Sequence, residues 1–238
     1  MKSTILASVL LAAGLAGAAA AHTLTLDLAA TPPIAAFAHK GALEPIPGAR
    51  IASAVALDGA GRVSEIALTR TEARATLAAP PGAAAILTRY VGLNAGRGPD
   101  RTRKVGSRTA NPDVAVVGRS EVDALTLLRP GADLSALPPA PLRLAPVGVA
   151  AGLRKGDSIT LMATFRGQPL AGATIRLQAL ASETGGLSVV SGSDGRITVI
   201  VPESGPNLFV INHEDRTGDD PDAHVIRRQA SLGFSAAP

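Results

Sequence analysis

Residues 157–165, DSITLMATF, place an apolar side chain at every second position from Ile159 onward. Ile159, Leu161, Ala163 and Phe165 fall on one side of an extended chain. Ser158, Thr160 and Thr164 fall on the other. Period-two alternation is typical of a β-strand that buries one face. The pattern returns in ATIRLQAL (173–180), GRITVIVPE (195–203), NLFVINH (207–213) and HVIRRQASLGF (224–234). Turn sequences such as RGQPLAG and GSDGR separate these strands, which together predict an antiparallel sandwich of immunoglobulin-like or transthyretin-like form.

The first half of the chain predicts shorter strands. IASAVALDGAGRVSEIALTR (51–70) and ARATLAAPPGAAAILTRYVG (73–92) each resemble two strands around a turn, and EVDALTLL (121–128) predicts another strand. Residues 92–111 are basic and lack an apolar period, which indicates a long exposed loop. A Pro-rich stretch, 129–146, indicates a domain boundary. We therefore expect an all-β chain with two sandwich domains, residues 22–140 and 141–238.

Residues 1–21 have the features of a cleavable secretory signal. Lys2 provides the positive start, ILASVLLAAGLAG the apolar run and AAAA the small residues before a cut. A membrane-spanning helix needs about 20 apolar residues, and this run is shorter. We expect a periplasmic protein that is not embedded in the membrane after processing. Loss of Lys2 lowers the net charge from +4 to +3, a mild excess that specifies no partner.

The chain has no cysteine, so disulfides and thiolate metal sites are excluded. A transition-metal site would need histidine, carboxylates, methionine, backbone groups or the amino terminus. His22 follows the run of small residues directly. A cut after Ala21 places its imidazole beside a new α-amine, and the two can chelate one metal. Cuts after Ala20 or Ala19 place the histidine second or third, and an ordinary frayed terminus is the alternative.

The other histidines are His39, His213 and His224, and no two histidines have a metal-binding sequence spacing. For each alone, a structural role is the simpler interpretation. The run HEDRTGDDPDAH (213–224) contains several carboxylates that suit Ca²⁺, although the EF-hand order is absent. The alternative is a solvated connection between two strands.

Signals for catalysis or nucleic-acid binding are absent from the sequence. There is no cysteine nucleophile, no G-x-S-x-G elbow and no phosphate-binding glycine loop. Aromatic residues make up 2% of the chain, which leaves few side chains to stack on bases. We expect neither an enzyme nor a nucleic-acid-binding protein.

The C-terminal half resembles a family of exported bacterial proteins described as periplasmic components of cobalt or nickel uptake. The resemblance rests on LRKGDSITLMATFRGQPLAGATIRLQAL, SGSDGRITVIVPESGPNLFVINHED and HVIRRQASLGF, and covers residues 156–234. The AAAAH sequence is similar to that family's histidine after the leader. The resemblance implies two β-sandwich domains and a metal-related role, with His22 and His213 at the family's histidine positions.

Three functions follow as hypotheses. The first is a periplasmic protein that binds nickel or cobalt, with copper as an alternative, through His22, His213 and either His39 or His224. It would pass the ion to a membrane transport complex. The second is a metal-free interaction module. The third is a copper oxygenase with an amino-terminal histidine, which the shortage of aromatic residues disfavours.

Overall fold

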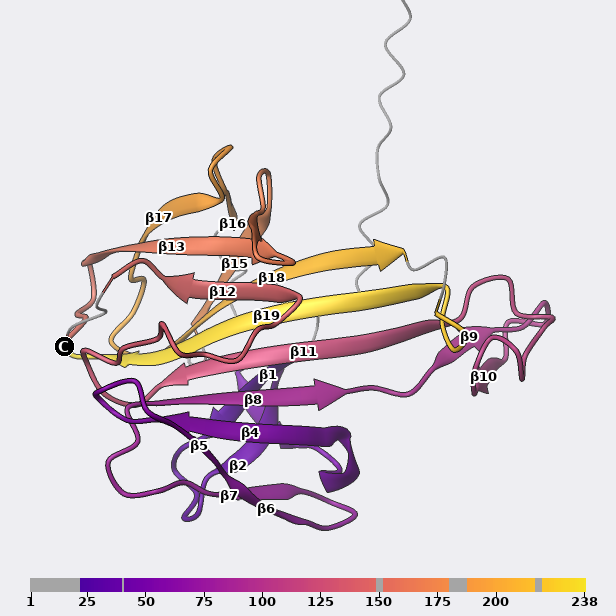
Figure 1. Cartoon of the computed structure of the whole chain (residues 1–238), viewed down its shortest axis with the longest axis horizontal. Coiled ribbons are helices and arrows are strands. Elements are labelled where there is room, and N and C mark those ends of the chain that lie inside the picture. Colours follow the sequence, from indigo (N-terminus) through magenta and orange to yellow (C-terminus); the bar gives the residue numbers. More distant parts are fainter. Residues whose placement is uncertain (1–21, 40, 149–151, 180–187, 217–219) are drawn as a thin grey trace, which may run out of the picture.

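The computed structural model describes residues 22–39, 41–148, 152–179, 188–216 and 220–238. Its strands form three sheets, and the described residues contain no α-helix, only the short 3-10 helix η1 (Gly48–Arg50). The predicted all-β class with packed sheets is confirmed (Figure 1). The expected leader, 1–21, lies outside the described residues.

The first sheet contains five short strands from the N-terminal part. They are β1 (Thr23–Asp27), β2 (Ile34–His39), β3 (Ala42–Pro45), β6 (Ala67–Arg70) and β7 (Ala75–Ala78). All neighbouring strands are antiparallel, and β2 pairs with both β1 and β3. The first three strands of the chain therefore lie side by side.

The central sheet has ten strands and draws them from both halves of the chain. Its main order is β16-β15-β18-β19-β11-β8-β4-β5, and a hairpin of β9 and β10 attaches to β11. Their bounds are β4 (Ile51–Leu57), β5 (Val63–Glu65), β8 (Ala85–Val91), β9 (Ala95–Arg97), β10 (Arg103–Val105), β11 (Gly118–Leu127), β15 (Thr174–Ala179), β16 (Ser188–Val190), β18 (Gly205–Arg216) and β19 (Val225–Ala236). The pairing of β11 with β19 is parallel and joins the two halves.

The third sheet is small and comes wholly from the C-terminal half. It contains β12 (Leu142–Pro146), β13 (Ser158–Phe165), β14 (Gln168–Pro169) and β17 (Arg196–Ile200). In Figure 1 β12, β13 and β17 lie in the upper part of the view beside β15, β16 and β18, and β2, β6 and β7 lie below β4. The central sheet is thus covered on both faces over part of its area.

Two large cores fill the spaces between these layers. Leu125 and Leu127 of β11 belong to the core against the third sheet, whereas Val122 and Ala124 of the same strand belong to the core against the first sheet. Successive side chains of a strand point to opposite faces, so one strand supplies both cores. Consecutive buried residues such as 85–88 follow from this double coverage, which explains why alternation is weak there in the sequence.

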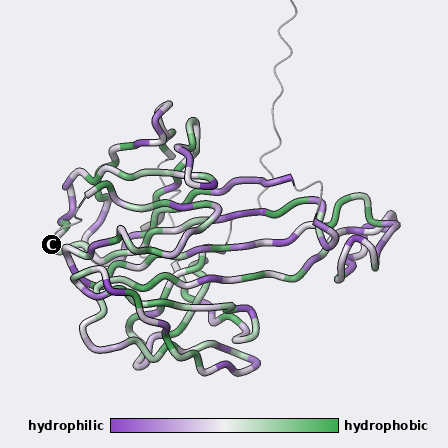
Figure 2. Tube along the Cα trace, viewed as in Figure 1, coloured by the Kyte–Doolittle hydropathy of each residue, from purple (hydrophilic) through white to green (hydrophobic). Residues whose placement is uncertain are grey.

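The sharp alternation predicted for residues 157–165 is confirmed. Ile159, Leu161 and Ala163 are buried in β13, while their neighbours Thr160 and Met162 are only half-buried. The third sheet has one face on the core and the other towards solvent, and this is the arrangement that produces a period of two. Figure 2 shows hydrophobic and hydrophilic residues alternating along several strands.

The basic segment 92–111 differs from the loop that we expect. It contains the hairpin of β9 and β10, in which Arg97 lies opposite Arg103. Each of the two strands has only three residues, and only Ala95 pairs with β11. The hairpin therefore does not enter the core, and its sequence lacks the apolar alternation of a core strand. In Figure 1 the hairpin projects beyond the end of β11.

The chain passes the expected boundary near residue 140 without leaving the shared core. Leu57, Leu87 and Leu125 pack in the same cluster as Leu161, Phe209 and Leu232. No helix of the described residues has the length and apolar character needed to cross a membrane.

Candidate metal centre

His22 and His39 meet at the edge of the first sheet. His22 precedes β1, whose Thr23 pairs with Ala38, and His39 ends β2. This register places the two histidines opposite each other, and their ring centroids lie 4.5 Å apart. The pairing of β1 with β2 therefore brings together His22 and His39, two of the four candidate histidines.

Glu44 joins the two rings from the neighbouring strand. It lies on β3 opposite Phe37, diagonal to the His39–Ala42 pair. Its Oε1 lies 3.4 Å from His39 Nδ1, and its Oε2 lies 3.8 Å from His22 Nε2. One ligand atom from each of the three side chains falls within 4.8 Å of the others.

These separations suit a shared ion. Imidazole nitrogens and carboxylate oxygens bind transition metals at about 2.0–2.2 Å, so two ligands of one ion lie about 3–4.4 Å apart. Small side-chain rotations would bring all three atoms to that distance. As ion pairs alone, histidine and glutamate at an exposed position contribute at most about 1 kcal/mol.

An aromatic ladder fixes the position of His22. Its ring lies edge-on to Phe37 at 5.7 Å, and Phe37 lies edge-on to Tyr90 of β8 at 5.3 Å. The Ser231 hydroxyl also donates a hydrogen bond to the Leu24 carbonyl at 2.7 Å, which ties β1 to β19. The candidate ligands therefore extend from a packed sheet rather than from a free chain end.

The site is open to solvent. The side chains of His22, His39 and Glu44 are 49%, 24% and 53% exposed. Structural metal sites are usually closed, four-coordinate shells. Three protein ligands at an accessible surface leave coordination positions for water, a further ligand or an exchange partner.

The structure places His213 away from this cluster. His213 lies on β18, and its ring centroid is 4.2 Å from that of Phe165 in the third sheet. Residues 209 and 211 of the same strand face the core against the third sheet, so His213 shares that face. The central sheet thus lies between His213 and the first sheet that carries His22.

His224 has a structural partner. Its Nδ1 accepts a hydrogen bond from the Val117 amide at 3.1 Å, and its own amide donates to the Val117 carbonyl at 2.8 Å. These bonds position the start of β19 beside β11. One ring nitrogen is therefore already used.

Two carboxylates of the acidic run, Asp215 and Asp220, form ion pairs with arginines. Asp215 contacts Arg228 at 3.0 Å and Arg166 at 3.1 Å, and Asp220 contacts Arg119 at 3.1 Å. Asp219 and its two neighbours, 217–218, lie outside the described residues. Within the described part of the chain, His22, His39 and Glu44 are the one group of three or more such ligands that converges.

Sequence reasoning missed Glu44. The available signal was the two-residue connection Lys40–Gly41 between IAAFAH and ALEP, which is compatible with a hairpin. Pairing across that hairpin brings Glu44 beside His39. The isolated glutamate in GALEPIPG carries no metal signature of its own.

Comparisons with known proteins found no matching family model, no matching curated protein and no matching solved structure.

Proposed function

We propose that this protein is a non-catalytic periplasmic carrier of a divalent transition metal, nickel or cobalt, that serves a membrane uptake system. The convergence of His22, His39 and Glu44 carries this proposal. The proposal also includes a leader that is cleaved before His22 and a C-terminal part, residues 141–238, of immunoglobulin-like or transthyretin-like type.

Cleavage after Ala21 would add a fourth ligand without any change in the fold. The α-amine would then belong to His22 itself, and amine and imidazole of one residue can chelate the same ion. Three nitrogens and one carboxylate oxygen suit Ni²⁺, Co²⁺ and Cu²⁺. Cu²⁺ generally binds such sites most tightly, so metal supply and the transport partner would select the cargo.

Solvent access supports a transfer role. A carrier must acquire and release its ion, and three exposed or half-exposed ligands at a sheet edge allow both. Protons compete with a metal ion for imidazole nitrogen. We therefore expect affinity to fall as the pH decreases towards 6.

The test is calorimetric titration of correctly processed protein with Ni²⁺, Co²⁺, Cu²⁺ and Zn²⁺. His22→Ala, His39→Ala and Glu44→Gln should each weaken binding at least about tenfold, because each removes a ligand. His213→Ala is the matched control and should bind like the wild type. Equal affinity in the wild type and the His22→Ala variant contradicts the proposal.

Thermal unfolding separates this proposal from the metal-free interaction module. A metal at 100 times its Kd stabilises the folded state by about 2.7 kcal/mol. The melting temperature should rise with nickel or cobalt in the wild type and not in His39→Ala. Unchanged melting with every metal favours the interaction module.

A further inference from the structure

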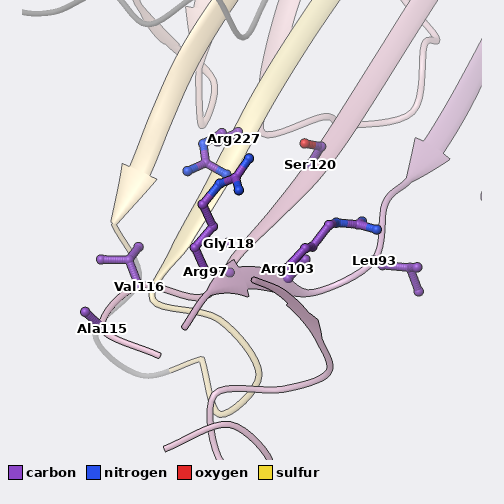
Figure 3. A pocket seen from close by; sticks show the side chains of 10 residues that line it. Leu93, Arg97, Arg103, Ala115, Val116, Gly118, Ser120 and Arg227 are labelled. Atoms are coloured by element: carbon purple, nitrogen blue, oxygen red, sulfur yellow. The ribbon is translucent and has the colours of Figure 1, made fainter. Parts of the chain in front are cut away.

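Three arginines surround a pocket at the end of the central sheet, far along the chain from the candidate metal ligands. The pocket has a volume of about 560 Å³ and is lined by Arg97, Arg103 and Arg227 together with Ser120, Gly118 and apolar residues (Figure 3). A volume of this size is within the range of small-molecule sites. We propose that it binds a small organic dianion, a phosphate ester or a dicarboxylate, with an apolar group attached.

Strand register places the three arginines on one face. Arg97 lies directly opposite Arg103 in the β9–β10 hairpin. Ala95, two residues before Arg97, pairs with Gly118 of β11, and Ser120 of β11 pairs with Arg227 of β19. Side chains two residues apart in a strand share a face, so the pairing places all three arginines on the same face of the sheet.

Like charges at directly opposite positions destabilise a sheet. The positive charges of Arg97, Arg103 and Arg227 are not balanced by carboxylates on the same face. Arg103 and Arg227 form no ion pair with any carboxylate in residues 22–39, 41–148, 152–179, 188–216 and 220–238. Arg97 donates only to the backbone carbonyl of Arg101, at 3.0 Å. A bound dianion would supply the missing negative charge.

Neighbouring carboxylates are used elsewhere. Glu214, the cross-strand neighbour of Arg227, pairs with Arg216 at 3.2 Å. Asp113 of the loop after the hairpin pairs with Lys104, which alternates to the face opposite Arg103. The arginine face therefore keeps its charge, while the opposite face of the hairpin is neutralised.

The Arg227 side chain lies over a glycine that makes room for it. A Cβ on Gly118 would come within 2.7 Å of Arg227 Nη1. In Figure 3 the side chains of Arg97 and Arg227 reach towards each other beside Gly118. A larger residue at 118 would displace Arg227 from the pocket without any change in net charge.

The chemistry of the wall defines the ligand class. A guanidinium group presents a planar fork of donors that matches carboxylate and phosphate oxygens. Leu93 and Val116 line the same pocket and are 42% and 53% exposed. Charged donors beside exposed apolar side chains suit a dianion that carries a hydrophobic group rather than a bare inorganic ion.

The test is calorimetric titration of the processed protein with phenyl phosphate, phthalate and inorganic phosphate at low ionic strength. Phenyl phosphate should bind more tightly than inorganic phosphate because only the former contacts the apolar wall. Its affinity relative to phthalate tells whether the site takes a phosphate ester or a dicarboxylate. Failure of all three to bind at millimolar concentration overturns the proposal.

Variants establish where the dianion binds. Arg97→Gln, Arg103→Gln and Arg227→Gln should each weaken binding about tenfold. Arg74→Gln removes an exposed arginine outside the pocket and should have no effect beyond that of net charge. Equal losses in Arg74→Gln and Arg227→Gln would show nonspecific attraction and reject the site.

Gly118→Ala tests position separately from charge. It should weaken phenyl phosphate binding while the circular dichroism spectrum and melting temperature confirm a folded protein. Arg103→Gln, in the projecting hairpin, remains informative if a β11 or β19 variant fails to fold. The site does not depend on the metal proposal, because His39→Ala should leave dianion binding unchanged.

Discussion

At the scale of residues, Arg228 joins two carboxylates from different strands. Its Nη1 lies 2.7 Å from Glu121 Oε2, and its Nε lies 3.0 Å from Asp215 Oδ2. All three side chains are at most 12% exposed. Arg228→Met would leave Glu121 with Arg119 and Asp215 with Arg166 but would remove two charge-assisted hydrogen bonds. It should therefore lower the free energy of unfolding by about 2 kcal/mol in urea denaturation at pH 7.

The pH dependence of that loss follows from Asp215. Burial raises the pKa of Asp215, but the hydrogen bonds and charges of Arg228 and Arg166 outweigh it and leave the pKa below its ordinary value. A lowered pKa stabilises the folded state above the unfolded pKa, near 3.8, and the contribution disappears as the pH falls further. The destabilisation by Arg228→Met should shrink below pH 4. Arg176→Met, a strand arginine on β15, is the control and should change stability by less than about 0.5 kcal/mol.

At the scale of elements, the turn between β16 and β17 depends on a glycine. Gly195 has a φ of 74°, and a Cβ there would lie 2.6 Å from the Ala163 carbonyl oxygen. Gly172 has a similar φ of 68° with no atom within 4 Å of its would-be Cβ. Gly172→Ala should cost about 1 kcal/mol from backbone strain alone, and Gly195→Ala clearly more. Equal costs in urea unfolding would contradict the role of close packing at Gly195.

Most elements were predictable because strand patterns are local. The turn at 58–61 is confirmed, since Asp58 accepts hydrogen bonds from the amides of Ala60 and Arg62. Which strands pair with each other was harder to predict from the sequence. β7 and β8 flank the predicted turn at 80–82, yet they belong to different sheets. A turn sequence specifies a change of direction, whereas packing decides which sheet each strand joins.

At the scale of the whole molecule, the shared core predicts one cooperative unit. β11 and β19 pair over nine residues, and the core against the third sheet includes side chains from both halves of the chain. Differential scanning calorimetry should show a single transition whose calorimetric and van't Hoff enthalpies agree. Leu125→Ala and Leu161→Ala, from opposite halves, should lower the same melting temperature. Two transitions that respond separately to these variants would indicate independent domains.

The sequence by itself determined the all-β class, the positions of most strands and turns, and the buried face of β13, because each depends on neighbours within a few residues. It also singled out His22 and His39 as candidate ligands, but gave no reason to join them to Glu44 rather than to His213. Only the tertiary structure showed that His22 and His39 lie beside Glu44. It likewise showed that Arg97, Arg103 and Arg227 line one pocket. Both depend on strand register, and register is set by the packing of whole sheets rather than by any local pattern.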